Sequence, residues 1–218
     1  MLGVFLDTET NGLNASIHKL LEIAYVLIDL ETGEEKARYQ AVVHQSAAVW
    51  ATSDPESLKI TAFRWEEVER GEDASEIARV ITEMFKRHNI QRKKAVFICQ
   101  NPSFDRVFFG QLIDANAQEA LRWPYHWLDL ASMYWALAMD GAKLRGELLP
   151  WKTGFSKDSI AKRYKLAPER KPHRAMNGVE HLVLCYTAVV GFPKLHHHNS
   201  GSGLITQARG GKGLGPFS

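Results

Sequence analysis

The chain of 218 residues is predicted to have an α/β fold, a mixed β-sheet with helices on its faces, and three observations support this prediction. Residues 2–6 are an almost unbroken apolar run, which is typical of a strand buried on both faces. Segments 19–30 and 37–44 have strand composition and are joined by a turn, which predicts an antiparallel meander. An amphipathic helix at 72–88 leads into a short apolar strand at 95–99, and this order requires a crossover connection and a mixed sheet.

Composition and charge restrict the class of protein. The composition is close to that of average globular proteins and predicts one domain, while a net charge of +2 neither indicates nor excludes a nucleic-acid partner. Cys99 and Cys185 lie in apolar segments, as expected of buried thiols in a reducing compartment. The N-terminal residues lack the pattern of a secretory leader and no apolar run approaches ~18 residues, so we expect a cytoplasmic protein that does not cross a membrane.

The second half of the chain is predicted to be mainly helical. We interpret the apolar block at 127–137 as a helix leading into a loop at 141–154, and Ser156 as the cap of a short helix ending at residue 164. A last helix then presents one apolar face, formed by Val179, Leu182, Val183, Tyr186 and Val190.

Gly191 and Pro193 are expected to end that last helix. The folded domain is therefore assigned to residues 1–193. Residues 194–218 are rich in Gly, Ser and His and are interpreted as a flexible tail, for which an origin in the expression vector is one explanation.

The first candidate site follows the N-terminal strand. Asp7 and Glu9 are two residues apart, so both side chains point to one face with Cα atoms roughly 6.6 Å apart, close enough to share one cation. Asn11 and Gly12 then turn the chain. Taken alone, this pattern is better explained as the polar end of a strand.

A second acidic residue, Asp105, follows the strand at 95–99. Ser103 is a candidate helix cap, and Asp105 would then lie in the first turn of the helix. A carboxylate there complements the helix dipole and contributes ~0.3–1 kcal/mol, which alone is the simpler explanation.

The third candidate is His173, held between Pro172 and the start of the last helix. In order and spacing, these three segments resemble the motifs of the DnaQ-like 3′–5′ exonucleases of the DEDDh type, over about residues 2–192. The matching residues are Asp7-Thr8-Glu9-Thr10, Asn101-x-x-Phe104-Asp105 and His173-x-Ala175.

That family includes the proofreading subunit of bacterial replicative DNA polymerase, ribonuclease T and oligoribonuclease. The resemblance implies a ribonuclease H-like fold, with a five-stranded mixed sheet between helices. It also implies two divalent cations, Mg²⁺ or Mn²⁺, about 4 Å apart and bound by converging carboxylates. Asp7 would bridge both ions, Glu9 would bind the ion next to the nucleophile, and Asp105 would bind directly or through water. His173 would be the general base.

Four further residues are candidates for substrate binding. By resemblance, Thr10 and Leu13 would touch the terminal nucleotide, although Leu13 is equally well explained as core. Phe63 and Trp65 lie in a region that borders the active site in this family, and stacking of a base on an aromatic ring is worth ~1–3 kcal/mol. The sequence leaves DNA and RNA open as substrates.

The chain departs from the family pattern in one place, because Gly178 stands where the last metal-binding aspartate is expected. Glu180 is rotated by ~200° around the helix and is poorly placed to replace it, while His181 shares the face but lies a turn away. Two functions therefore remain open. One is an exonuclease acting on single-stranded 3′ ends with impaired metal binding, and the other is an inactive module that binds nucleic acid. A homodimer and a polymerase-associated subunit are both open as assemblies.

Overall fold

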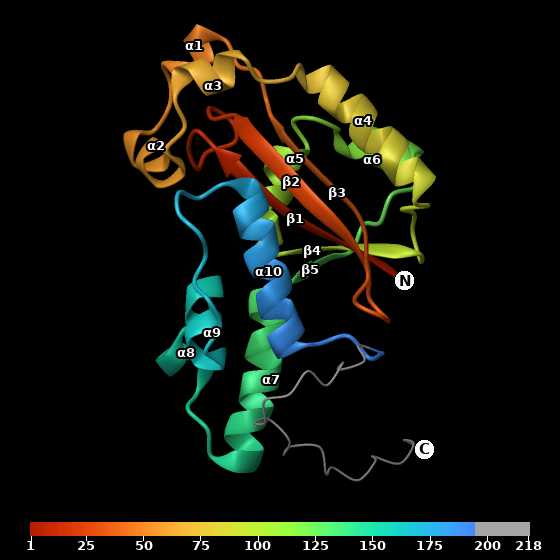
Figure 1. Ribbon diagram of the computed structural model, residues 1–218, viewed down its shortest axis with the longest axis vertical. Coiled ribbons are helices and arrows are strands. Elements are labelled where there is room, and N and C mark those ends of the chain that lie inside the picture. The colour runs from red at the N-terminus through yellow and green to blue at the C-terminus, as the bar shows by residue number, and fades with distance from the viewer. Residues whose placement is uncertain (195–218) are drawn as a thin grey trace, which may run out of the picture.

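The computed structural model describes residues 1–194, and the rest of the predicted tail lies outside the described residues. Five strands form one mixed sheet in the order β3-β2-β1-β4-β5, which confirms the predicted fold class (Figure 1). β1 pairs antiparallel with β2, and β2 with β3, whereas β4 runs parallel to both β1 and β5. The strands are β1 (Leu2–Thr10), β2 (Leu20–Asp29), β3 (Glu35–Val42), β4 (Ala95–Cys99) and β5 (Trp127–Asp129).

Helices pack on both faces of this sheet, α4 and α5 on one face and α7, α9 and α10 on the other. The helices are α1 (Ala47–Trp50), α2 (Pro55–Thr61), α3 (Trp65–Glu69), α4 (Ala74–Arg87), α5 (Pro102–Phe109), α6 (Ala115–Ala120), α7 (Leu130–Arg145), α8 (Pro150–Thr153), α9 (Lys157–Tyr164) and α10 (Ala175–Val189). Phe5 belongs to the core beneath α10 and Leu6 to the core beneath α5. Because strand side chains alternate, Asp7 and Glu9 continue the Phe5 face, and Thr8 faces α5.

The predicted helix at 127–137 is wrong in its first part. Residues Trp127–Asp129 form β5, where the Trp127 ring stacks on Phe97 at 4.1 Å. Asp129 then caps α7, because its carboxylate accepts the N–H groups of Ala131 and Ser132 at 3.0 and 3.1 Å. Asp129 thus ends the strand and caps the helix. Because apolar residues occur on both sides of Asp129, the sequence pattern predicted one helix in place of a strand followed by a helix. α7 also continues into the predicted loop at 141–154, which contains α8 as well.

The predicted cap of α5 is also wrong. The helix begins at Pro102, and the capping position is Asn101, whose φ of 60° is left-handed. Ser103 lies inside the first turn and donates its hydroxyl to Asn101 Oδ1 at 2.8 Å. Proline suits the first helical position because its missing N–H would have no helical partner there.

The other predicted helices are confirmed. The helix at 72–88 is α4, and Ser156 caps α9 by accepting the N–H of Ser159 at 3.2 Å. After α10, Gly191 adopts a φ of 78°, a conformation that suits glycine at a helix end.

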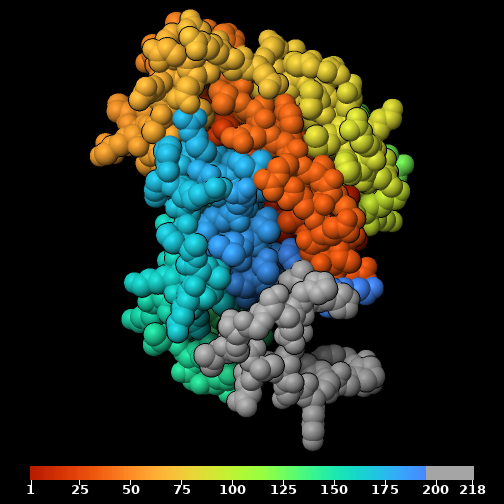
Figure 2. Space-filling model, viewed as in Figure 1, coloured from red at the N-terminus to blue at the C-terminus, as the bar shows by residue number. Residues whose placement is uncertain are grey.

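Cys99 and Cys185 are buried free thiols, as predicted. Among residues 1–194, no helix has the length and apolar character needed to cross a bilayer. In the space-filling view, α10 (blue) lies directly against the β2–β3 segment (orange) (Figure 2). An ion pair between Arg38 of β3 and Glu180 of α10, at 3.1 Å, joins these two elements at the surface.

Candidate active site

Asp7 and Glu9 lie at the end of β1, on the sheet face covered by α10. Glu9 is paired in register with Glu22 of β2. The Glu22 Oε2 atom accepts the backbone N–H of Ala175 at 2.8 Å, so the start of α10 is held against the strands. This bond brings the segment that carries His173 to the edge of the sheet where the two acids lie.

Asp105 approaches the same edge from α5. β4 runs parallel to β1 and ends at Cys99, so the first turn of α5 stands beside the end of β1. Asp105 is buried, and its Oδ1 atom accepts the hydroxyl of Thr8 at 2.8 Å. The structure therefore places Glu9 and Asp105 each within electrostatic range of Asp7.

Burial and proximity make these carboxylates difficult to ionise together. Burial raises the pKa of Asp7, and Glu169 raises it further, while Lys157 opposes the rise. Burial, and then repulsion from Asp7 and Glu22, raises the pKa of Glu9 to about 8. The pKa of Asp105 is raised well above its usual range by burial and by Asp7. A set of mutually repelling carboxylates is the environment that a cation stabilises.

His173 lies in the segment between α9 and α10. Its Nδ1 atom is 2.8 Å from Glu169 Oε1, and its Nε2 atom contacts the Lys171 ammonium. The backbone N–H of His173 donates to the carbonyl of Ile60 at 3.3 Å, which ties this segment to α2. The imidazole is therefore oriented by a carboxylate, an arrangement found around catalytic histidines.

Two charged residues of the site were missed in the sequence, Lys157 and Glu169. The Lys157 Nζ atom lies 3.2 Å from Asp7 Oδ1, 3.2 Å from Glu169 Oε2 and 3.3 Å from the Gly178 carbonyl oxygen. Burial alone would raise the pKa of Glu169, but neighbouring His181 and Lys157 lower it to about 2. Lys157 could have been found, because it shares a helix face with the buried residue Ile160. Glu169 carries no comparable signal.

The acidic set is suited to a hard divalent cation, but its oxygens are partly engaged. Asp7 Oδ1 accepts from Lys157, and Asp105 Oδ1 accepts from Thr8. Within residues 1–194, no three His, Cys, Asp or Glu side chains are arranged closely enough to form a metal cluster. Carboxylate oxygens are the ligands that a hard divalent cation prefers, whereas the ammonium at Asp7 occupies one of these oxygens.

Gly178 lies directly against Asp7. A Cβ atom built at Gly178 would be 2.2 Å from Asp7 Oδ2, so the carboxylate occupies the space of a side chain. Glu180 points away and pairs with Arg38 and Arg170, as its position on the helix predicted.

His181 is buried on the inner face of α10. Its Nδ1 atom is 3.4 Å from Glu169 Oε2. Interactions with Cys185 and then with Glu169 raise its pKa to about 9. His181 thus lies against Glu169, and no contact between its ring and Asp7, Glu9 or Asp105 is found among residues 1–194.

The predicted substrate-binding residues differ in accessibility. Leu13 is 75% exposed, so the alternative that it belongs to the core is wrong. Thr10 is buried and donates its hydroxyl to the Gly12 carbonyl at 2.8 Å. Phe63 is 5% exposed and the Arg174 guanidinium covers its ring at 3.8 Å, so the prediction that it stacks on a base is wrong. Trp65 is half-buried, with its ring centre 6.0 Å from that of Trp50.

A different group of aromatic rings is exposed near the site. Trp135 of α7 lies with its ring centre 5.5 Å from those of Trp151 and Phe155, and all three are partly open to solvent. Trp135, Phe155 and Asp129 line a hollow of about 210 Å³. The Phe155 carbonyl accepts the Gln100 side chain at 3.2 Å, which places this aromatic group beside the end of β4.

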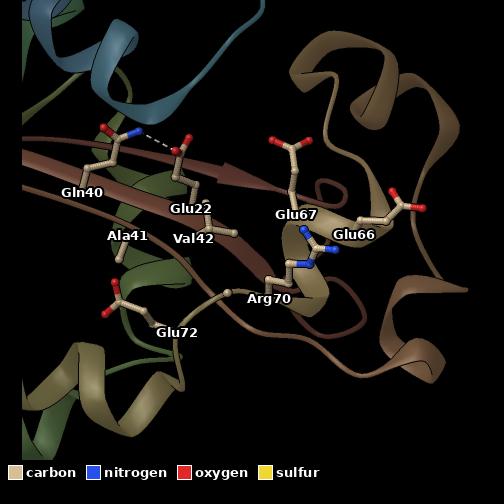
Figure 3. A pocket seen from close by; sticks show the side chains of 9 residues that line it. Glu22, Gln40, Ala41, Val42, Glu66, Glu67, Arg70 and Glu72 are labelled. Atoms are coloured by element: carbon tan, nitrogen blue, oxygen red, sulfur yellow. Dashed lines mark hydrogen bonds between the residues drawn. The ribbon is translucent and has the colours of Figure 1, made fainter.

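A second hollow, of about 570 Å³, lies across β2, β3 and α3 (Figure 3). Glu22 lines it, with Gln40 donating to Glu22 Oε1 at 2.7 Å, and so do Glu67 of α3 and Arg70, which directly follows α3. Glu22 lies between this hollow and the acidic site. Asp7, Glu9 and Asp105 do not line the hollow.

The sheet order and the acidic edge define an α/β nuclease fold of the ribonuclease H-like type. The chain is similar to E. coli exonuclease I in its zinc-bound complex with single-stranded DNA, with a TM-score of 0.65 and 18% identity over 87% of this chain and 40% of that chain. It is also similar to the nuclease domain of 3′hExo, a DEDDh family member bound to rAMP. For that domain the TM-score is 0.62 and the identity 12%, over 89% of this chain and 94% of that chain.

Sequence comparison then identifies the family. Residues 4–184 match the family model for exonucleases of the RNase T type, so the chain belongs to this exonuclease family. Ribonuclease T of Actinobacillus pleuropneumoniae serotype 5b (strain L20) is 30% identical over 139 residues, which are 61% of this chain. The match spans 63% of the length of that relative.

Proposed function

We propose that the chain is a metal-dependent 3′–5′ exonuclease that releases mononucleotides from single-stranded nucleic acid. The observation that carries the proposal is the meeting of Asp7, Glu9 and Asp105 at one edge of the sheet, beneath the segment that holds His173. Their mutual repulsion and burial are difficult to explain as a stabilising feature of the fold, because buried charges without partners destabilise a protein.

In this proposal, Asp7, Glu9 and Asp105 hold a divalent cation, Mg²⁺ or Mn²⁺, which supplies charge neutralisation at the scissile phosphate when bound. His173 would take the proton of the attacking water. The carboxylate of Glu169 accepts from Nδ1 at 2.8 Å and so favours the tautomer in which Nε2 carries the lone pair of a base. Glu169 is thus a positioning residue for His173. Lys171 contacts Nε2 in this structure and would have to move before Nε2 takes a proton.

The substrate class follows from similarity and from the exposed rings. E. coli exonuclease I and 3′hExo have been described with single-stranded DNA and with rAMP, so both sugars remain candidates for this chain. Trp135, Trp151 and Phe155 offer ring faces for bases leaving the acidic edge. Stacking on rings binds strands of any sequence.

A degradation assay tests the proposed function. With Mn²⁺, we expect 5′-labelled single-stranded DNA or RNA to shorten progressively from its 3′ end, and EDTA to stop the reaction. Asp7→Asn should lower the rate by about 10²–10³-fold, the usual effect of removing one group that stabilises the transition state. Asp140→Asn, an exposed carboxamide substitution on α7, is the matched control. Absence of products from every single strand would contradict the proposal.

A second function is favoured by one observation, the presence of Gly178 and Lys157 beside Asp7 where the family has a metal ligand. A module that binds strands without cutting them would keep the aromatic surface and lose turnover. In a gel-shift assay, the unmodified chain and Asp7→Asn would then bind a labelled single strand with equal affinity. Neither protein would release nucleotides with Mn²⁺.

The aromatic surface gives a prediction for either function. Trp151→Ala is expected to weaken single-strand binding by about 5–150-fold, because stacking of one base contributes ~1–3 kcal/mol. Trp151 is 50% exposed, so the fold should tolerate the change. Fluorescence anisotropy with a labelled oligomer measures the affinity. Tyr125→Ala, which removes an exposed ring near Arg92, is the control, and equal affinities for both variants would place the strand elsewhere.

A further inference from the structure

The ammonium group of Lys157 is surrounded by oxygen atoms of the acidic site. Three oxygens lie within 3.3 Å of its Nζ atom, on Asp7, Glu169 and the Gly178 backbone. An ammonium group has three N–H donors, so these oxygens use all of them. No donor is left to bind a substrate phosphate, and the charge acts on the carboxylates themselves.

Gly178 is required for this arrangement. Asp7 Oδ2 would be 2.2 Å from a Cβ atom at position 178, and the Gly178 carbonyl oxygen is one of the partners of Lys157. Any side chain at this position would push the Asp7 carboxylate away from the helix. Gly178 therefore leaves space for the close Asp7–Lys157 pair. It also means that the aspartate of the family pattern is absent at position 178.

Glu169 restores a carboxylate to the site from a different element. It is 4% exposed at its side chain, lies in the segment before α10, and contacts both Lys157 at 3.2 Å and His173 at 2.8 Å. The chain thus has four buried or half-buried carboxylates around this edge, Asp7, Glu9, Asp105 and Glu169, together with one fixed ammonium.

We infer that Lys157 is a built-in cation that takes the place of one of the two divalent ions of the family, so that this chain binds a single divalent ion. In this arrangement Glu9 and Asp105, with the free oxygen of Asp7, are left to bind that ion. Lys157 and Glu169 are positioning residues that fix Asp7 and His173. This inference rests on the proposed function, because a divalent ion at this site has a role only in an exonuclease. It concerns the number of ions bound per chain, which is measured without following the reaction.

Electron paramagnetic resonance of Mn²⁺ provides the test. Two Mn²⁺ ions ~3.5–4 Å apart interact magnetically, whereas a single ion gives an uncoupled spectrum. The protein is titrated with Mn²⁺, alone and with thymidine 5′-monophosphate, and calorimetry counts the bound ions. One uncoupled ion per chain is the expected result. A coupled pair would overturn the inference, and so would the binding of no ion.

The variant Lys157→Met removes the charge and keeps the length of the side chain. It frees carboxylate oxygens of Asp7 and Glu169, so we expect a second Mn²⁺ to bind and the coupled spectrum to appear. Lys162→Met, on the exposed side of the same helix, should keep the single-ion spectrum. A folded Lys157→Met protein that still binds one uncoupled ion would overturn the role given to Lys157. If this variant does not fold, the spectrum of the unmodified protein still shows whether the chain binds one Mn²⁺ ion or a coupled pair.

The degradation assay separates this inference from the proposed function. An active exonuclease with a coupled Mn²⁺ pair would keep the function and reject the built-in cation. A chain that binds one uncoupled ion but degrades no strand would keep the built-in cation and reject the function.

Discussion

Gly178→Asp is expected to lower the exonuclease rate by about 100-fold or more, the opposite of what the family pattern alone suggests. A Cβ atom at this position would lie 2.2 Å from Asp7 Oδ2, so the carboxylate must move by roughly 1 Å to reach ordinary contact. A displacement of that size in a group that positions reactants costs about 10²-fold in rate. The added negative charge would also compete with Asp7 for the Lys157 ammonium. Single-turnover degradation of a labelled strand with Mn²⁺ measures the effect.

Two matched variants separate size from charge. Gly178→Ala introduces only the Cβ atom and should cause most of the loss. Asn177→Asp adds the same charge one residue earlier, at a side chain that contacts the Pro172 carbonyl and not Asp7. It loses the bond that the Asn177 amide donates to that carbonyl at 3.2 Å, because a carboxylate cannot donate, and it should retain most of the rate. If Gly178→Asp were as fast as the unmodified chain or faster, the Asp7 carboxylate would have another productive position, and the family pattern would be the better guide.

The second large effect is expected on stability, from the buried pair of Lys157 and Glu169. Their side chains are 14% and 4% exposed, and removal of one partner of a buried ion pair costs about 3–5 kcal/mol because the other charge loses a compensating neighbour. Lys157→Met and Glu169→Leu should each destabilise the fold by about this amount. The double variant should lose less than the sum by about 2–3 kcal/mol, since the Lys157–Glu169 contact is then lost only once, although Asp7 and His173 each lose one partner. Urea unfolding in EDTA measures all three free energies.

An exposed ion pair provides the control. Arg79 and Glu83 are joined at 2.6 Å on α4, with side chains 54% and 59% exposed. The cycle formed by Arg79→Met, Glu83→Leu and the double variant should give a coupling energy of about 0.5 kcal/mol or less. A similarly small coupling for Lys157 and Glu169 would mean that water screens the pair, and the close contacts around Asp7 would then contribute little to the fold.

Patterns within single elements predicted most of the fold. The apolar run of β1, the amphipathic face of α4 and the cap at Ser156 are local features, and each forms the expected element. The errors occurred where two elements meet. Asp129 both ends β5 and caps α7, and Asn101 starts α5 from a left-handed conformation that the sequence does not reveal. Elements as short as β5 are determined by pairing with a neighbouring strand, which local periodicity does not contain.

The candidate residues Asp7, Glu9, Asp105 and His173 were predicted from the order and spacing of three motifs that resemble those of the DEDDh exonucleases, because the pattern around each acid taken alone has a simpler explanation. The surroundings of Asp7 became visible only in the folded chain. Lys157 and Glu169 reach it from α9 and from the segment before α10, and Lys157 lies 150 positions away from Asp7 along the chain. The free energy of such a pair depends on burial and on distances of about 3 Å, and both are set by the packing of distant elements rather than by residue spacing.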